Sequence, residues 1–202
     1  MGWDACAGLP AGGGLGMERV LVIGCPGAGK STFAWALQGA TGLPLYYLDQ
    51  LFHLPDGSHV SQADFDEGLA AILKAPRWII DGNYQRTLAP RLARCDTVFL
   101  LDYPLSVCLA GAAARIGKAR PDMPWIERTF DPAFRQWILD FPTAQRPQLY
   151  AQLAQYKENK QHIIFHSREE STIWLENWAK AQKGVVKIFP ATSGASHWPQ
   201  SC

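Results

Sequence analysis

One stretch of the sequence constrains the fold more than any other. Residues 24–32 read Gly-Cys-Pro-Gly-Ala-Gly-Lys-Ser-Thr, which fits the pattern Gly-x-x-x-x-Gly-Lys-[Ser/Thr]. The apolar run Arg19–Ile23 before it is typical of a buried strand, and a helical pattern, Ser31–Ala40, follows. A glycine-rich turn between strand and helix lets backbone N–H groups converge on phosphate oxygens at a positive helix N-terminus. The sequence therefore predicts a phosphate-binding loop.

Strand and helix patterns alternate along the rest of the chain. Short apolar runs predict further strands at Leu45–Leu48, Trp78–Ile80, Val98–Leu101 and Ile163–Phe165. Helices are expected after the N-cap residue Ser61, from Pro104 to about Ile116, and from a capping box of Ser167 and Glu170 through Trp178. Short apolar strands separated by helices form right-handed βαβ units, so we expect one three-layer α/β/α domain with a five-stranded parallel sheet. Val185–Phe189 is a candidate edge strand.

Both ends and one internal segment interrupt this alternation. Residues 1–16 contain six glycines, and we expect a disordered leader before a domain that begins at Met17. Residues 191–202 are rich in chain-breaking residues and are expected to form a flexible tail. The pattern also lapses between about residues 117 and 131, which predicts a small mobile lid inside the domain 17–190.

Composition excludes several classes of protein. A chain with 48% hydrophobic and 18% charged residues is not disordered. Its longest apolar runs, such as Thr97–Leu101, fall far short of the ~20 residues that cross a bilayer. The net charge of +1 gives no argument for nucleic acid or an anionic membrane as a partner. The five cysteines are odd in number and form no Cys-x-x-Cys, which favours a reducing cytoplasm.

The loop residues identify candidate cofactors. Lys30 would reach the β- and γ-phosphates of a nucleotide, and the Ser31 hydroxyl would bind Mg²⁺. A strand-terminal carboxylate holds magnesium beside such loops; Asp81 and Asp102 both qualify, with helix capping as the alternative role of Asp102. No Asn-Lys-x-Asp motif is present, which favours ATP over GTP. The expected ATP contacts in the loop are Gly24, Gly27, Ala28, Gly29, Lys30, Ser31 and Thr32.

Other residues are candidates for contacts to a phosphate acceptor. Asp49 follows a predicted strand, at the edge of the sheet where ligands bind, and would bind or deprotonate a hydroxyl; a turn carboxylate is the alternative. His53 is a candidate substrate contact, with packing as the alternative. Arg115 and Arg120 border the lid and would neutralise a transferring phosphoryl group, unless they belong to a solvated basic loop. Arg168 would stack on a base.

Several motifs together carry a family resemblance. Besides the loop, they are Leu48-Asp49-Gln50-Leu51-Phe52-His53, Ile79-Ile80-Asp81-Gly82-Asn83-Tyr84, Leu101-Asp102-Tyr103-Pro104 and Arg120-Pro121-Asp122. From Met17 to about Lys180 the chain resembles the adenylate-kinase-like P-loop proteins often labelled topology modulation proteins. The resemblance implies a P-loop fold of the nucleoside-monophosphate-kinase type.

A weaker similarity to true adenylate kinases adds one residue to the candidates. Their stretch Asp-Gly-Phe-Pro-Arg-Thr resembles residues 81–87, which contain one extra residue. This similarity implies that Arg86 contacts an acceptor phosphate, and that Arg115 and Arg120 correspond to lid arginines.

These observations predict Mg²⁺- and ATP-dependent phosphoryl transfer to a small molecule. Cations and a carboxylate at one rim suit an acceptor with an anionic group and a nucleophilic hydroxyl or phosphate oxygen. Two alternatives stay open: a regulatory ATPase switch that uses water, and a nucleic-acid-associated protein that affects DNA topology. Direct binding to nucleic acid or membrane is not expected. The sequence indicates neither the acceptor nor the oligomeric state.

Overall fold

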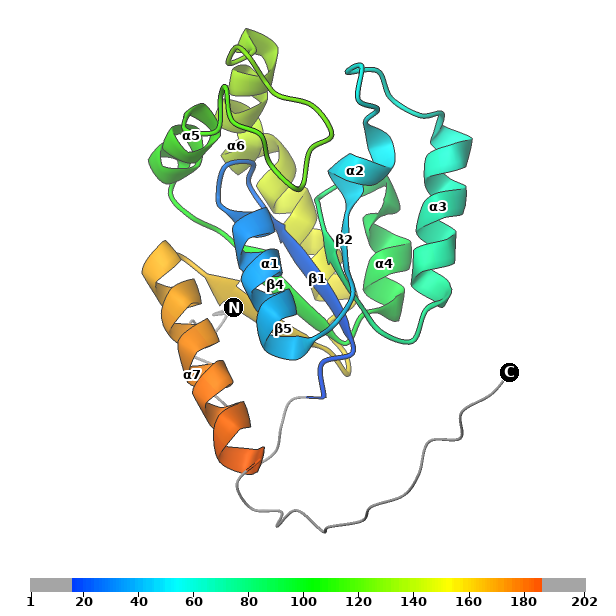
Figure 1. Ribbon diagram of the computed structural model, residues 1–202, viewed down its shortest axis with the longest axis vertical. Helices are drawn as coiled ribbons and strands as arrows, with labels where there is room; N and C mark the ends of the chain where they lie inside the picture. Colours follow the sequence, from blue (N-terminus) through cyan, green and yellow to red (C-terminus); the bar gives the residue numbers. More distant parts are fainter. Residues whose placement is uncertain (1–15, 187–202) are drawn as a thin grey trace, which may run out of the picture.

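The computed structural model describes residues 16–186, so the expected leader, apart from Gly16, and the expected tail lie outside it (Figure 1). Within these residues, five parallel strands form one sheet in the order β2-β3-β1-β4-β5. The strands are β1 (Arg19–Gly24), β2 (Leu45–Tyr47), β3 (Trp78–Asp81), β4 (Thr97–Leu101) and β5 (Gln161–Phe165). The predicted five-stranded parallel sheet is confirmed.

Helices cover both faces of this sheet, as Figure 1 shows. The central strand β1 explains why: Val20 and Val22 point into one core, Leu21 and Ile23 point into the other, and all four are fully buried. A strand that is buried on both faces reads as an uninterrupted apolar run. The helices are α1 (Lys30–Thr41), α2 (Leu48–Phe52), α3 (Gln62–Lys74), α4 (Leu88–Arg94), α5 (Leu105–Ala113), α6 (Pro132–Gln155) and α7 (Arg168–Val186), with a short 3₁₀ turn at Gln85–Thr87.

Three boundaries differ from the expectation. Strand β2 ends at Tyr47, and Leu48 already begins α2. Helix α5 is capped by Pro104 and ends at Ala113, which leaves Arg115 in the segment that follows it. Helix α7 extends to Val186, so the first two residues of the expected edge strand are helical and the others lie outside the described residues.

The long helix α6 is the largest element that the sequence patterns do not predict. It contains Pro142 and Pro147, which normally interrupt a helix because proline lacks an N–H and clashes with the preceding turn. Tertiary packing supports it: its first half contributes Ile138 to one core, and its second half contributes Leu149 to the other. Neither α6 nor any other helix between residues 16 and 186 has the length and apolar character needed to cross a membrane.

The parallel register places the ends of the strands at one edge. Gly24 at the end of β1 is level with Leu101 in β4, and Val22 is level with Asp81 in β3. Because all strands point the same way, the loops that follow them gather on this edge, where open α/β sheets bind their ligands.

Candidate functional site

The loop between β1 and α1 has the geometry that its glycines predict. Gly27 has a φ of 79°, a left-handed conformation that residues with a Cβ rarely adopt. A Cβ on Gly27 would collide with the backbone carbonyl of Cys108 in α5, so only glycine lets the loop pack there. Gly29 caps the twelve-residue helix α1, and no side chain caps that end. The N–H groups of the first turn are therefore available to an anion.

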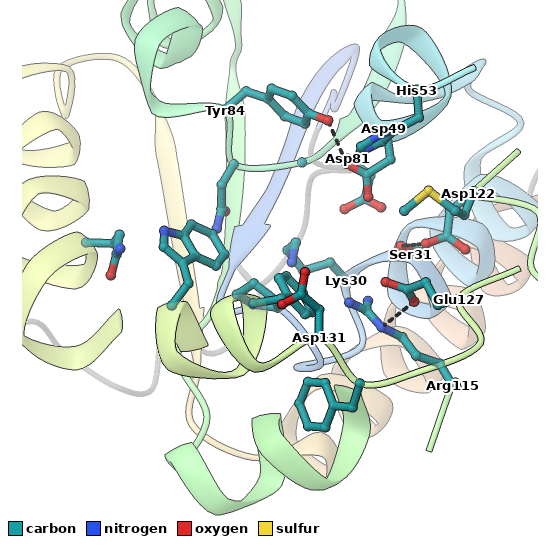
Figure 2. Close-up of a pocket in the computed structure, with 18 of the residues that line it drawn as sticks. Lys30, Ser31, Asp49, His53, Asp81, Tyr84, Arg115, Asp122, Glu127 and Asp131 are labelled. Atoms are coloured by element: carbon teal, nitrogen blue, oxygen red, sulfur yellow. Dashed lines mark hydrogen bonds and ion pairs between the residues drawn. The ribbon is translucent and has the colours of Figure 1, made fainter. Parts of the chain in front are cut away.

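Lys30 and Ser31 stand at the start of α1, facing acidic residues from three other segments (Figure 2). The Lys30 Nζ lies 3.3 Å from the Cys25 carbonyl oxygen and donates to it. The Ser31 hydroxyl donates to the Asp122 carboxylate, with 2.9 Å between Oγ and Oδ2. The hydroxyl expected to bind magnesium therefore lies in a carboxylate environment, although Asp122 was not among the predicted site residues.

Asp81, like Asp122, is a buried carboxylate among the acidic residues that face Lys30 and Ser31. Its exposed fraction is 5%, and its Oδ1 has no hydrogen-bond partner among the described residues. Burial raises the pKa of Asp81 to about 7, and the nearby Lys30 ammonium and Ser31 hydroxyl oppose that rise. An unpaired, buried carboxylate oxygen beside a lysine and a serine hydroxyl suits a bound divalent cation, because oxygen is the preferred ligand of Mg²⁺.

Asp102, the other candidate for magnesium, has different neighbours. It accepts a hydrogen bond of 2.8 Å from the Tyr150 hydroxyl and lies 3.7 Å from Nη1 of Arg146, both in α6. It lines a separate cavity of ≈ 480 Å³ with Cys25, and neither Lys30 nor Ser31 lines that cavity. The structure thus brings Asp81, and not Asp102, to the cavities that Lys30 and Ser31 line. Within the described residues, no three His, Cys, Asp or Glu side chains form a metal site by themselves.

Asp49 comes from α2, directly after β2. It accepts a hydrogen bond of 2.9 Å from the Tyr84 hydroxyl. Burial, together with the Asp49 charge, raises the pKa of Tyr84, so this phenol stays protonated and orients the carboxylate. His53 lines the same cavity as Asp49 and packs edge-on against Trp125, with 6.3 Å between ring centroids.

Residues 114–131 between α5 and α6, which contain the predicted lid, fold onto the start of α1 (Figure 1). Ion pairs hold this segment together: Arg120 lies 2.9 Å from Asp122 and 3.2 Å from Glu127, and Arg115 lies 3.3 Å from Glu127. The arginines expected to close over a phosphoryl group are thus tied to carboxylates of their own segment. The sequence patterns did not assign those carboxylates a role.

Arg86 lies away from this group. Its guanidinium makes two hydrogen bonds, of 2.8 and 2.7 Å, to the Asp66 carboxylate, and both side chains are about half exposed. The preceding residues Asn83, Tyr84 and Gln85 line the cavity that contains Asp49, whereas Arg86 does not. The structure thus pairs Arg86 with Asp66 and does not bring it to the acceptor side as the similarity to adenylate kinases implied.

Arg91 in α4 is a positioning residue that sequence reasoning missed. Its side chain is fully buried, and it donates to the carbonyl oxygens of Thr87 (3.0 Å), Gly82 (2.7 Å) and Tyr84 (3.0 Å) and to that of Asn83. The loop from β3 to α4 is therefore held by one guanidinium. Only tertiary structure reveals this role, because Arg91 reads as a surface residue of a short helix.

Replacing Arg91 by methionine should lower the melting temperature by roughly 10 °C. The change removes the Arg91 donor from the buried carbonyl oxygens of Thr87 and Gly82, at about 1–3 kcal/mol each, whereas the Tyr84 oxygen keeps two donors from Thr87. In a domain of this size 1 kcal/mol corresponds to about 2–4 °C. Thermal denaturation measures the effect. Arg94→Met, at an exposed position of the same helix, is the matched control and should change little. Equal melting temperatures of the two variants would contradict the role of Arg91.

Two cavities meet at the start of α1. The first, the loop cavity, has a volume of ≈ 780 Å³ and is lined by residues 27–32, Lys118, Arg120 and Arg168. The second, the Asp49 cavity, has a volume of ≈ 640 Å³ and is lined by Asp49, His53, Asp81 and residues 83–85. Both cavities are also lined by Lys30, Ser31, Arg115 and Asp122.

The other residues predicted to contact ATP differ in whether they line the loop cavity. Ala28, Gly29 and Thr32 line the loop cavity. Gly24 lines neither cavity, because the Asn83 side-chain amide pairs with both its N–H and its carbonyl oxygen, at 2.9 and 2.7 Å. Arg168 lines the loop cavity, and its Nη2 lies 3.4 Å from the Gly27 carbonyl oxygen.

Comparisons with known proteins identify the fold. No protein-family model matches the chain, and no curated protein matches it in sequence. The shikimate kinase from Bacteroides thetaiotaomicron is similar in structure, with 18% identity, a TM-score of 0.50, and coverage of 85% of this chain and 99% of that chain. The shikimate kinase from Acinetobacter baumannii in complex with shikimate has 14% identity, a TM-score of 0.51, and coverage of 85% and 94%. At such identities the likeness establishes the fold alone, which is the expected three-layer P-loop fold.

Proposed function

We propose that this chain is a kinase that transfers the γ-phosphoryl group of Mg²⁺-ATP to a small acceptor. One observation carries the proposal. The loop cavity and the Asp49 cavity are both lined by Lys30, Ser31 and Arg115. A donor in the loop cavity and an acceptor in the Asp49 cavity would therefore meet at these residues. Such a shared boundary is what direct transfer requires, because most of the catalysis lies in positioning and charge neutralisation.

On the donor side, Lys30 and the free N–H groups of α1 would hold the β- and γ-phosphates. Ser31 and Asp81 would hold magnesium, which when bound neutralises phosphate charge. Asp102 is the less favoured candidate because Tyr150 and Arg146 already contact it. Arg120 and Arg168, which line the loop cavity, would contact the nucleotide, with Arg168 near its base.

On the acceptor side, Asp49 would accept the proton of the acceptor hydroxyl. Its hydrogen bond from Tyr84 fixes the carboxylate, and Arg91 fixes the loop that carries Tyr84. Arg115 lines both cavities, as Lys30 does, and would face the transferring group. Because charge develops on that group in the transition state, a preoriented cation lowers the barrier more than it strengthens binding.

Arg115→Ala should lower kcat by about 10²–10³-fold, the usual cost of removing a group that stabilises transition-state charge. The KM of the acceptor and the affinity for ATP should stay within a few fold of wild type. Steady-state kinetics separate these effects, and Arg128→Ala, at an exposed position of the lid, is the control. A raised KM with unchanged kcat would show that Arg115 only binds the ground state.

A screen of ADP formation tests the proposal. The wild-type protein is incubated with ATP, with and without Mg²⁺, and with nucleosides, nucleoside monophosphates, sugars and hydroxy acids as acceptors. We expect ADP only when both Mg²⁺ and a suitable acceptor are present. Equal ADP formation with and without every acceptor would instead support a regulatory ATPase that uses water.

A further inference from the structure

Starting from the proposed kinase function, we infer that the acceptor is an uncharged, ring-bearing hydroxyl compound. The Asp49 cavity combines carboxylates, aromatic walls and unpaired neutral polar groups, and among the described residues each lysine or arginine that lines it also lines the loop cavity. This replaces the expectation from the sequence that the acceptor carries an anionic group.

Negative charges outnumber positive charges among the side chains that line the Asp49 cavity. Among residues 16–186, Lys30 and Arg115 are the lysine and arginine side chains that line it, and they stand where this cavity meets the loop cavity. Arg115 is moreover paired with Glu127 at 3.3 Å. The carboxylates are more numerous and come from α2, β3 and residues 114–131, as Figure 2 shows for Asp49, Asp81, Asp122, Glu127 and Asp131.

The lining carboxylates outnumber the lysine and arginine side chains around them. Apart from Asp81, four carboxylates line the cavity, against Lys30 and Arg115 in the lining and Arg120, which pairs with Asp122 and Glu127 from outside it. Lys30 would also be engaged by the phosphates of ATP. An anionic group on the acceptor would therefore enter a partly buried site of like charge without a partner, which is costly because solvent screens such repulsion poorly there.

The cations that could have changed this balance lie elsewhere. Arg86 is paired with Asp66 and does not line the cavity. Lys118 and Arg120 line the loop cavity and not the Asp49 cavity. Among the described residues, the acceptor side thus has no arginine beyond Arg115.

The walls of the cavity suit a ring. Rings and amides line much of it, and this set is His53, Tyr84, Trp125, Phe130, Phe134, Trp137, Asn83, Gln85, Gln145 and Gln148. Flat apolar faces with a few polar groups favour a ligand that has a ring face and hydroxyls. The volume of ≈ 640 Å³ lies within the usual range for small-molecule sites.

Two neutral polar atoms in these walls lack partners. The Gln145 Oε1 and the Trp125 Nε1 are buried and make no hydrogen bond with any described residue. One accepts and the other donates. Hydroxyls both donate and accept, so a hydroxyl compound can pair with both atoms, whereas an ionised phosphate only accepts and would leave Gln145 unpaired.

Matched acceptor pairs test the inference. The pairs are adenosine and AMP, glucose and glucose 6-phosphate, and the uncharged cyclic polyol inositol and the carboxylate shikimate. We expect the best uncharged compound to have a kcat/KM at least tenfold above its anionic counterpart, measured by ADP formation. An equal or higher value for the anionic compound overturns the inference, as does a panel in which no uncharged compound is phosphorylated.

A charge-insertion variant gives a second readout. Gln148→Arg adds a cation to the Asp49 cavity and should reduce the preference for the uncharged member of a pair by about tenfold. Gln136→Arg, at an exposed position of α6 that does not line the cavity, is the control and should leave the preference unchanged. Identical preferences in the two variants would overturn the inference.

Failure of this inference and failure of the proposed function are distinguishable. ADP formation with anionic acceptors alone would retain a kinase and reject the uncharged acceptor. Failure of Mg²⁺-ATP to stabilise the protein in a thermal denaturation experiment without any acceptor would reject the kinase itself.

Discussion

Replacing Lys30 by alanine is expected to abolish most of the thermal stabilisation that Mg²⁺-ATP gives to the protein. A ligand at about 100 times its Kd adds roughly 2.7 kcal/mol to the free energy of unfolding. In a domain of this size, that corresponds to roughly 5–10 °C in melting temperature. The variant loses the one lysine in the described part of the chain that lines both cavities, and its ammonium group donates a hydrogen bond to the Cys25 carbonyl oxygen.

The measurement is a melting curve with and without Mg²⁺-ATP. Without ligand, Lys30→Ala should melt close to wild type, because one hydrogen bond to a carbonyl contributes only about 1 kcal/mol. Lys74→Ala, exposed at the end of α3, is the matched control and should keep the full shift. A full shift in Lys30→Ala would mean that the loop does not hold phosphates through this residue.

Asp49→Asn is expected to lower turnover with the acceptor by about 10²-fold or more, the usual scale for the loss of an acid–base group. Asparagine has nearly the same shape and can still accept the hydrogen bond from Tyr84, but it cannot take the hydroxyl proton. The stabilisation by Mg²⁺-ATP should remain near wild type, because Asp49 does not line the loop cavity. Steady-state kinetics and melting curves on the same preparation measure the two effects.

Asp66→Asn is the control for this variant. It removes a carboxylate that pairs with Arg86 on the surface, where an ion pair contributes less than about 1 kcal/mol, and turnover should not change. If Asp49→Asn weakened ATP binding as much as Lys30→Ala, Asp49 would be a magnesium-side residue. Unchanged turnover would make it a turn residue and would favour the ATPase alternative.

The strands and helices that the sequence predicted are those marked by residues within or next to the element itself. The strands are short apolar runs because both faces of the sheet are covered, and Ser61 caps α3 by accepting from the Asp64 N–H. Helix α6 was missed for the opposite reason. Its prolines argue against a helix locally, and contacts with both cores, which are distant in sequence, stabilise it.

The same distinction applies to the candidate site. The loop with Lys30 and Ser31 has a motif of fixed spacing and could be located from the sequence. The sequence could not distinguish Asp81 from Asp102, because both stand at the end of a buried strand. The contacts that distinguish Asp102 come from Tyr150 and Arg146 in α6. The outward turn of Arg86 likewise depends on Asp66, which lies 20 residues away in the chain.

The Arg91 contacts have a consequence for how the acceptor site can change. All four oxygens that Arg91 binds belong to the main chain, so these contacts do not depend on which side chains residues 82–87 carry. Gln85 gives up one side-chain hydrogen bond, of 3.2 Å to the Gln145 carbonyl oxygen, when it is replaced, and the Arg91 contacts to the loop remain. Gln148 faces the same cavity from α6. Combinatorial libraries at these two positions would alter acceptor choice on a fixed backbone, and divergence among descendants of such a protein would concentrate there before it reached the phosphate-binding loop.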